Sequence, residues 1–169
     1  QNLDDIRKYI TVQTIGHDKL NQLRHVKFFK DLEGVHAHMK KHAAILRPKF
    51  EMVEATLEKE LGGLGIGEWT TPKGGYFISF ESLDGCAKKI VAMAKEAGVV
   101  MTGAGATYPY GKDPKDSNIR IAPTYPPLGD LIVATELFAL CVKLTSAEKL
   151  LKEMEQNPQP VTVSYTHLT

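Results

Sequence analysis

The residue with the clearest chemical potential is Arg120, in the stretch SNIRIAP at residues 117–123. Side chains of an extended chain alternate between two faces, so Ile119 and Ile121 share one face and Arg120 points to the other. The stretch ends at a proline and lies beside loops rich in Gly, Tyr and Pro. A guanidinium presents a planar fork of donors that suits an acidic ligand. The spacing therefore predicts a carboxylate or phosphate site, with an arginine on the wet face of an edge strand as the alternative.

Three histidines invite a metal interpretation, because His38 and His42 are four residues apart and would share a helix face with His36 nearby. Zinc requires a third ligand of suitable type and a supporting shell, and no cysteine or carboxylate stands out as that ligand. The pattern is more typical of a solvated helix face.

Two other patterns suggest nucleophilic residues, but the motifs or the histidine that would accompany such a nucleophile are not found nearby in the sequence. The stretch SAEK at 146–149 has the serine-to-lysine spacing of penicillin-binding enzymes, yet without the other motifs Ser146 is expected to cap a short helix. Cys86 and Cys141 lie on expected apolar helix faces and have no histidine close in sequence. Reduced, buried thiols are therefore expected, as in a reducing compartment.

The glycine-rich stretch GGLGIG at 62–67 could be a phosphate loop, but a helix precedes it, a strand follows it and the final glycine of the dinucleotide fingerprint is missing. It is interpreted as a helix stop and a loose turn.

Composition narrows the class of function. The 169 residues contain 21 Lys and Arg against 20 Asp and Glu, so charge gives no reason to expect nucleic acid or an anionic membrane as partner. The sequence has no apolar run of membrane-spanning length and no signal-peptide features at its start, QNLDDIRKYI. A cytoplasmic location is expected. The missing initiator methionine suggests a fragment.

Hydrophobic spacing predicts the order of elements. The first third is helical, and apolar residues at steps of three and four predict a long helix over 35–61, with a kink or break near Arg47 caused by Pro48. Alternation predicts a strand that places Tyr76 with Ile78 and Phe80. The remaining expected elements are a helix capped by Ser82 and ending at Gly98, strands at 99–103 and around Arg120, and a helix from about 128.

These elements predict an α/β (α+β) fold, a two-layer domain with a three-stranded sheet and helices on one face. We expect four segments. They are a helical segment at 1–34, a kinked linking helix at 35–61, a small α/β domain at 62–155, and a tail at 156–169. The tail ends in VSYTHLT, which looks like translated vector sequence, and is expected to be non-native or disordered.

Several motifs together carry a resemblance to a known family. PKGGYFISF, GVVMTGAGATYPYG and SNIRIAPTYP stand in the order and spacing of the C-terminal part of fold-type-I pyridoxal-phosphate-dependent aminotransferases. TIGHDKLNQLRH and HMKKHAAILRPKFEMV narrow the resemblance to the bacterial aspartate aminotransferase group once lumped with regulator-like (MocR-type) aminotransferases. It covers about residues 1 to 155.

The resemblance implies site residues. Arg120 takes the position of the arginine that grips the substrate α-carboxylate, and Gly75, Tyr76 or Phe77 would line the substrate pocket. Both roles come from the family position of these residues.

The resemblance also bears on the rest of the chain. Arg24 and Gln22 would face the active site, and His17 departs from the proline expected there. The cofactor would be pyridoxal 5′-phosphate, but the lysine and aspartate that hold it belong to a large domain placed before residue 1. The chain is therefore expected not to bind the cofactor covalently and to be inactive alone.

The implied function of the parent is amino-group transfer between an amino acid, aspartate or glutamate by resemblance, and a 2-oxo acid. Its implied partners are these substrates, the large domain and a second subunit of a homodimer. Three alternatives remain open at this point: a stand-alone module that binds a small carboxylate without catalysis, a pure assembly domain, and a carbon–sulfur lyase or decarboxylase on the same fold.

Overall fold

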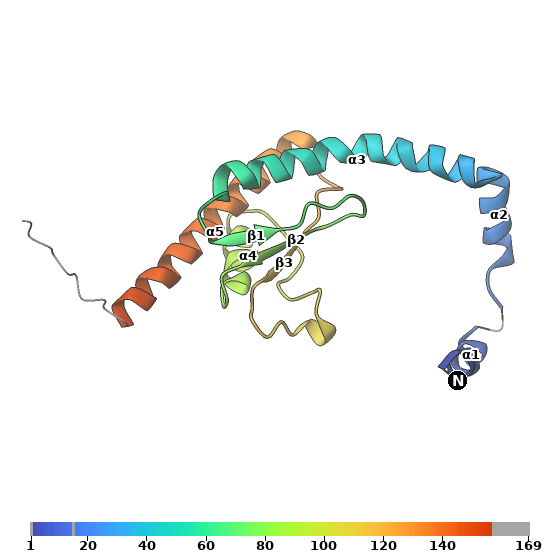
Figure 1. Cartoon of the computed structure of the whole chain (residues 1–169), viewed down its shortest axis with the longest axis horizontal. Coiled ribbons are helices and arrows are strands. Elements are labelled where there is room, and N and C mark those ends of the chain that lie inside the picture. Colours follow the sequence, from blue (N-terminus) through green and yellow to red (C-terminus); the bar gives the residue numbers. More distant parts are fainter. Residues whose placement is uncertain (1, 15, 157–169) are drawn as a thin grey trace, which may run out of the picture. The chain divides into compact units, whose positions relative to one another are not determined.

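The computed structural model describes residues 2–14 and 16–156, which fall into two units divided between Ile45 and Leu46. The first unit holds α1 (Asn2–Gln13), α2 (Lys19–Phe29) and the start of α3 (Leu32–Leu61). The second holds the rest of α3, then β1 (Gly67–Trp69), β2 (Ile78–Ser82), α4 (Ala87–Glu96), β3 (Asn118–Ile121) and α5 (Leu128–Gln156), with a short 3-10 turn at Pro109–Gly111 (Figure 1). The unit boundary falls within the expected linking helix at 35–61.

The second unit is built on a three-stranded antiparallel sheet in the order β1-β2-β3. Trp69 pairs with Phe80, and Ser79 pairs with Arg120. A side chain at Gly67 would collide with the ring of Phe80, which explains a glycine at the start of β1. The expected mixed α/β fold with a three-stranded sheet is confirmed.

The core of this unit lies between one face of the sheet and three helices. Ile78, Phe80 and Ile119 come from the sheet and pack in one cluster with Leu57 of α3 and Phe138 of α5. The rings of Phe80 and Phe138 meet edge to face at 5.1 Å. Apolar burial on one face leaves the other face of β2 and β3 for polar side chains.

The identity of the third strand differs from the sequence prediction. Residues 99–103 do not form a strand, because the N–H of Val99 closes the end of α4 on the carbonyl of Ala94 and the following residues join no ladder. The third strand is β1, which pairs with its neighbour β2 without a crossover.

Two further local predictions are wrong, and one is wrong in part. Helix α3 is continuous through Pro48, with Val53 and Leu57 continuing its buried face, so the break does not occur, while the kink stays a prediction. Ser82 is the last residue of β2 and its hydroxyl donates to the carbonyl of Ser117, while Cys86 precedes α4. Ser146 lies buried inside α5, which continues from Leu128 to Gln156 because its apolar face continues.

Tyr76 precedes β2 and is exposed, so it does not share the buried face of Ile78 and Phe80. Except for Gln156, which ends α5, the expected tail at 156–169 lies outside the described residues. Within the described ranges, no helix is both long enough and apolar enough to cross a membrane.

Candidate functional site

Arg120 lies on the sheet face opposite the core. Ile119 and Ile121 are buried in the core, as the alternation predicted, and Arg120 is half-buried on the other face. Its guanidinium carbon lies 4.4 Å from the centroid of the Phe77 ring. The Nε of Arg120 is buried without a hydrogen-bond partner, and no carboxylate among the described residues pairs with the guanidinium. The site therefore holds a cation whose donors are free for a ligand.

The loop before β2 brings a second predicted residue to this cation. Gly75 has a φ of +91°, a left-handed conformation that favours glycine and turns the chain into β2. Phe77 then places its ring face beneath the guanidinium, a cation–π contact that orients the fork without using its N–H groups. Tyr76 is exposed between them, and no hydrogen bond joins it to Arg120 in the described structure.

A small cavity adjoins Arg120. It has a volume of about 180 Å³, and its lining includes Met101, Thr102, Arg120, Leu131 and Phe138. The segment after α4, the end of β3 and the start of α5 enclose it. Most of this lining is apolar, so the cavity suits an uncharged group beside the cation rather than a second charge.

Polar side chains fix the strand that carries Arg120. Asn118, two residues earlier on the same face, donates from Nδ2 to the Oγ of Ser79 at 2.9 Å and to the carboxylate of Glu81. The hydroxyl of Thr107 donates to the Oδ1 of Asn118. Buried and satisfied on both ends of its amide, Asn118 locks β3 against β2 and against the loop at 103–117.

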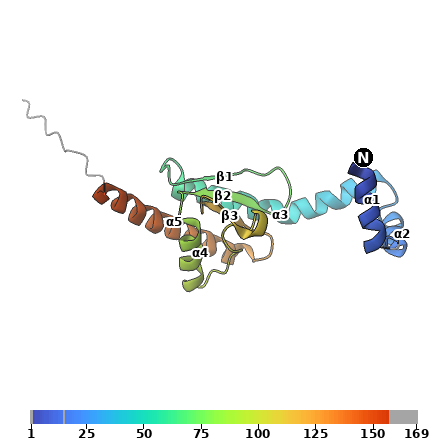
Figure 2. The same ribbon diagram turned by 90° about the horizontal axis from the view of Figure 1, so that it is seen from below.

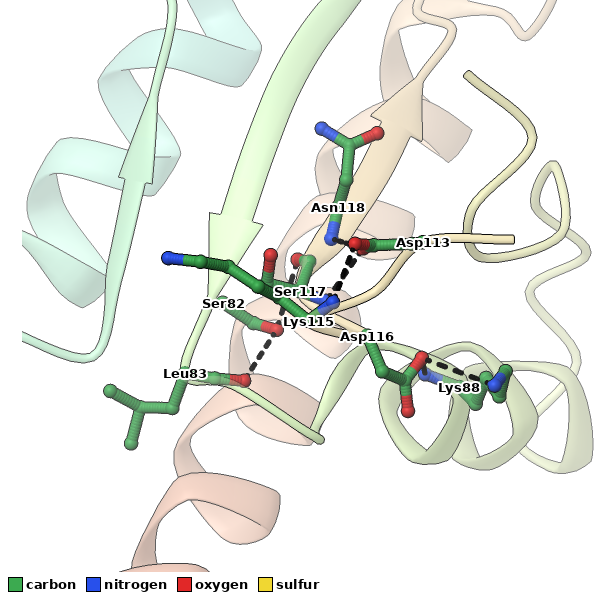
Figure 3. A network of polar contacts seen from close by, with 8 residues as sticks. All are labelled: Ser82, Leu83, Lys88, Asp113, Lys115, Asp116, Ser117 and Asn118. Carbon is green, nitrogen blue, oxygen red and sulfur yellow. Dashed lines mark hydrogen bonds and ion pairs between the residues drawn. The ribbon is translucent and has the colours of Figure 1, made fainter. Parts of the chain in front are cut away.

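Asp113 organises that loop from one carboxylate. Its oxygens accept from the backbone N–H groups of Lys115, Ser117 and Asn118 at 2.8 to 3.0 Å. Figure 3 shows this carboxylate directed at the start of β3, with Asp116 turned towards Lys88 of α4. Burial by itself would raise the pKa of Asp113, but the backbone N–H bonds together outweigh burial and lower its pKa.

The chain after β3 is held by Lys49 of α3. Its Nζ donates to the carbonyl of Thr124 at 2.8 Å and to that of Pro126 at 2.7 Å. A half-buried ammonium bound to two carbonyls fixes the turn between Arg120 and α5.

The remaining candidate residues come from other elements of the chain. His38 and His42 share a helix face with their Nε2 atoms 3.0 Å apart, and no group of three or more potential metal ligands occurs among the described residues. Cys86 and Cys141 are free and buried, and burial raises the pKa of both thiols. Arg24 and Gln22 are exposed on α2, in the first unit.

Sequence reasoning missed the residues that support Arg120. Asn118 had a signal, since alternation places it on the same face. Asp113 and Lys49 had none, because one acts through backbone N–H groups of its own loop and the other through carbonyls far along the chain.

Solved structures share this fold. An aspartate transaminase from Corynebacterium glutamicum has a TM-score of 0.78 and 46% identity, covering 84% of this chain and 34% of that chain. An α-aminoadipate aminotransferase from Thermus thermophilus, solved in complex with N-(5′-phosphopyridoxyl)-L-leucine, has a TM-score of 0.68 at 18% identity, covering 87% of this chain and 36% of that chain. At that identity the second structure supports the fold alone. The fold is that of aminotransferases.

Sequence comparison gives the family. Residues 1–154 match the aspartate amino-transferase family, and the chain belongs to it. A curated aspartate aminotransferase of Corynebacterium glutamicum is 47% identical over 146 residues, which make up 84% of this chain and 34% of that protein. The chain thus spans about a third of the length of the curated relatives that it matches, and the predicted resemblance is confirmed.

Proposed function

We propose that this chain supplies the substrate-carboxylate contact of an aminotransferase that moves an amino group between aspartate or glutamate and a 2-oxo acid. The observation that supports this most is the guanidinium of Arg120, half-buried and free of any described carboxylate. A buried donor without a partner costs about 1–3 kcal/mol, which a substrate carboxylate would offset. The family membership supports the class of reaction.

Phe77 and the turn at Gly75 complete the proposed contact. The Phe77 ring lies against the guanidinium and limits the directions in which the fork can point. A substrate bound to an oriented fork presents one face to the reacting group, and this orientation is worth several kcal/mol in related reactions. Tyr76, exposed beside them, would cover the bound substrate.

The cofactor that the family implies is pyridoxal 5′-phosphate, which when bound supplies an electron sink for breaking a bond at the substrate α-carbon. The residues described here do not fit its covalent attachment. No lysine is buried, and the half-buried lysines are already bonded: Lys49 to carbonyls, Lys143 to Glu60 and Lys149 to Glu153. In this proposal the attachment lysine belongs to a large domain outside this chain, and the whole protein works as a cytoplasmic homodimer.

A substitution in the whole protein tests the role of Arg120. Arg120→Ala should raise the KM for the amino acid by roughly 100-fold, since a paired charge-assisted contact is lost, and should leave cofactor affinity nearly unchanged. Lys112→Ala, at an exposed lysine of the neighbouring loop, is the matched control. Equal losses of substrate and cofactor affinity in Arg120→Ala would refute the assignment.

The proposal that no lysine of this chain attaches the cofactor can be tested on the 169-residue chain itself. After mixing with pyridoxal phosphate and reducing with borohydride, mass spectrometry should find no stoichiometric adduct at a single lysine. A full adduct at one site would show that the chain carries its own attachment residue.

A further inference from the structure

Two histidines of α3, His38 and His42, face each other one helical turn apart. Their Nε2 atoms are 3.0 Å apart and their ring centroids 4.6 Å apart. Residues four apart on a helix are neighbours on its surface, so the helical backbone itself brings the two rings together. His38 is half-buried and His42 is exposed, so solvent reaches the pair. Two imidazole nitrogens in this arrangement can share either a proton or a metal ion.

The corner between α2 and α3 holds the ring of His38 in place. Figure 2 shows this corner, where α2 meets the start of α3, from below. A side chain at Gly34 would collide with the carbonyl oxygen of Phe29, so glycine allows the corner to close. The rings of Phe28 and Phe29 then each meet the ring of His38 at 5.4 Å between centroids. These aromatic contacts orient the imidazole whose Nε2 faces His42.

The separation of the two nitrogens favours one coordination geometry. Imidazole nitrogens bind divalent metal ions at about 2.0–2.1 Å. Two such bonds at a right angle place the nitrogens about 2.9 Å apart, whereas the tetrahedral angle places them about 3.4 Å apart. The observed separation of 3.0 Å is close to the right-angle value. Right angles between nitrogen and oxygen ligands are typical of Cu²⁺ and Ni²⁺.

We propose that His38 and His42 chelate a tetragonal divalent ion, Ni²⁺ or Cu²⁺, through their Nε2 atoms, with water in the remaining positions. No group of three or more potential ligands gathers within residues 2–14 and 16–156, so this is an open chelate of two ligands and not a closed structural centre. Each neutral ring keeps its one proton on Nδ1 and gives its Nε2 lone pair to the metal. Coordination therefore replaces the contact between the rings with no net gain or loss of protons.

A hydrogen bond between the two rings is the competing interpretation of the same geometry. It requires the proton on Nε2 of one ring, whereas the chelate requires Nδ1–H on both rings. In the chelate, the helix holds the second imidazole at the metal once the first has bound, which raises the affinity by roughly 100-fold over that of a single histidine. The two interpretations therefore differ in metal affinity. The chelate uses neither Arg120 nor transamination, so its failure would leave the proposed function untouched.

Calorimetric titration of the 169-residue chain with NiCl₂, at about pH 7.5 where free imidazole is neutral, tests the chelate. One Ni²⁺ per chain is expected, and His42→Asn should weaken its binding by roughly 100-fold. His36→Asn, at an exposed histidine of the same helix, should bind as the wild type does. A wild type without binding, or equal weakening in His36→Asn and His42→Asn, would overturn the proposal.

A second control keeps the number of histidines constant. His42→Asn combined with Ala43→His retains all six histidines but sets the two of the pair five residues apart, on different faces of the helix. Both positions are exposed, so the fold should be kept, which circular dichroism checks. This variant should bind Ni²⁺ as weakly as His42→Asn does. Affinity equal to that of the wild type would show that the spacing of His38 and His42 does not matter, and would refute the chelate.

Electron paramagnetic resonance with one equivalent of Cu²⁺ tests the coordination geometry. The wild type should give a tetragonal signal with coupling to two imidazole nitrogens, and His38→Asn should give coupling to one at most. Competition between ions adds a second measurement, because the right angle favours Ni²⁺ over Zn²⁺. Coupling to a single nitrogen in the wild type, or tighter binding of Zn²⁺ than of Ni²⁺, would rule out the right-angle chelate.

Discussion

The two units of this chain differ in how much of their apolar surface is buried. In the second unit, residues from α3, the sheet, α4 and α5 enter one core, and α5 alone contributes Leu131, Phe138 and Val142. In the first unit, α1 and α2 have no buried residue, and apolar side chains such as Leu3, Val12 and Val26 are exposed.

The contacts of side chains differ in the same way. In the described part of the first unit, side-chain hydrogen bonds join residues three or four apart, as between Asp18 and Asn21 or Asp31 and Gly34. In the second unit there are local bonds as well, such as those of Asp113, but others join residues far apart in the sequence, as between Lys49 and Thr124 or Asn118 and Ser79. Local bonds define helices but do not fix them in a tertiary structure. The candidate site lies where long-range contacts are dense.

Core truncation should show the largest difference between the units. Phe138→Ala removes a fully buried ring that contacts Phe80, and should lower the free energy of unfolding by about 3–5 kcal/mol. Leu23→Ala in exposed α2 should change it by no more than about 0.5 kcal/mol. Urea unfolding followed by circular dichroism measures both. Similar losses in the two variants would mean that α2 is buried in solution.

The sequence predicts the features of this structure that depend on local spacing, and it fails for those that depend on long-range contacts. The alternation around Arg120 and the apolar spacing of the long helix report which side of an element is buried, and both are confirmed in the second unit. They succeed because the core lies on one side of each element.

The wrong predictions arise where distant parts of the chain compete for the same place in the fold, which a local sequence pattern does not report. Residues 99–103 have strand-forming side chains, but the sheet takes β1 instead, three residues long with Trp69 as its main signal. Ser146 resembles a cap, yet burial of the surrounding turn keeps the helix going. The contact of Arg120 with Phe77 depends on the pairing of β2 with β3, which spacing within either strand does not define.

The loop at 103–117 should show the next largest effect, through Asp113. Asp113→Asn replaces a charged acceptor of three backbone N–H bonds and should cost about 1.5–3 kcal/mol. Asp31→Asn, where one N–H is accepted in the first unit, is the comparison and should cost less. Both are measured by urea unfolding at neutral pH.

The pH dependence sharpens this prediction. Because the folded pKa of Asp113 is lowered, the unfolded state takes up its proton first as pH falls. Its contribution is therefore complete above the unfolded value near 3.8 and is lost as pH falls from there through the lower folded pKa. Wild type should lose more stability than Asp113→Asn over that window. Parallel pH curves for the two proteins would contradict the assigned bonds.

The smallest effect is expected from two lysines in contrasting surroundings. Lys49→Met removes two bonds to the carbonyls of Thr124 and Pro126 in a half-buried place, and should cost about 1 kcal/mol or slightly more. Lys8→Met removes an exposed pair with Asp5 at 3.7 Å and should cost less than about 0.5 kcal/mol. Methionine keeps most of the aliphatic stem, so the difference isolates the ammonium. Hydrogen exchange should locate the Lys49→Met loss at the start of α5, where the N–H of Leu131 donates to the carbonyl of Pro127 at the end of that turn. A loss spread evenly over the second unit would instead mean that Lys49 stabilises the core as a whole rather than the turn after Arg120.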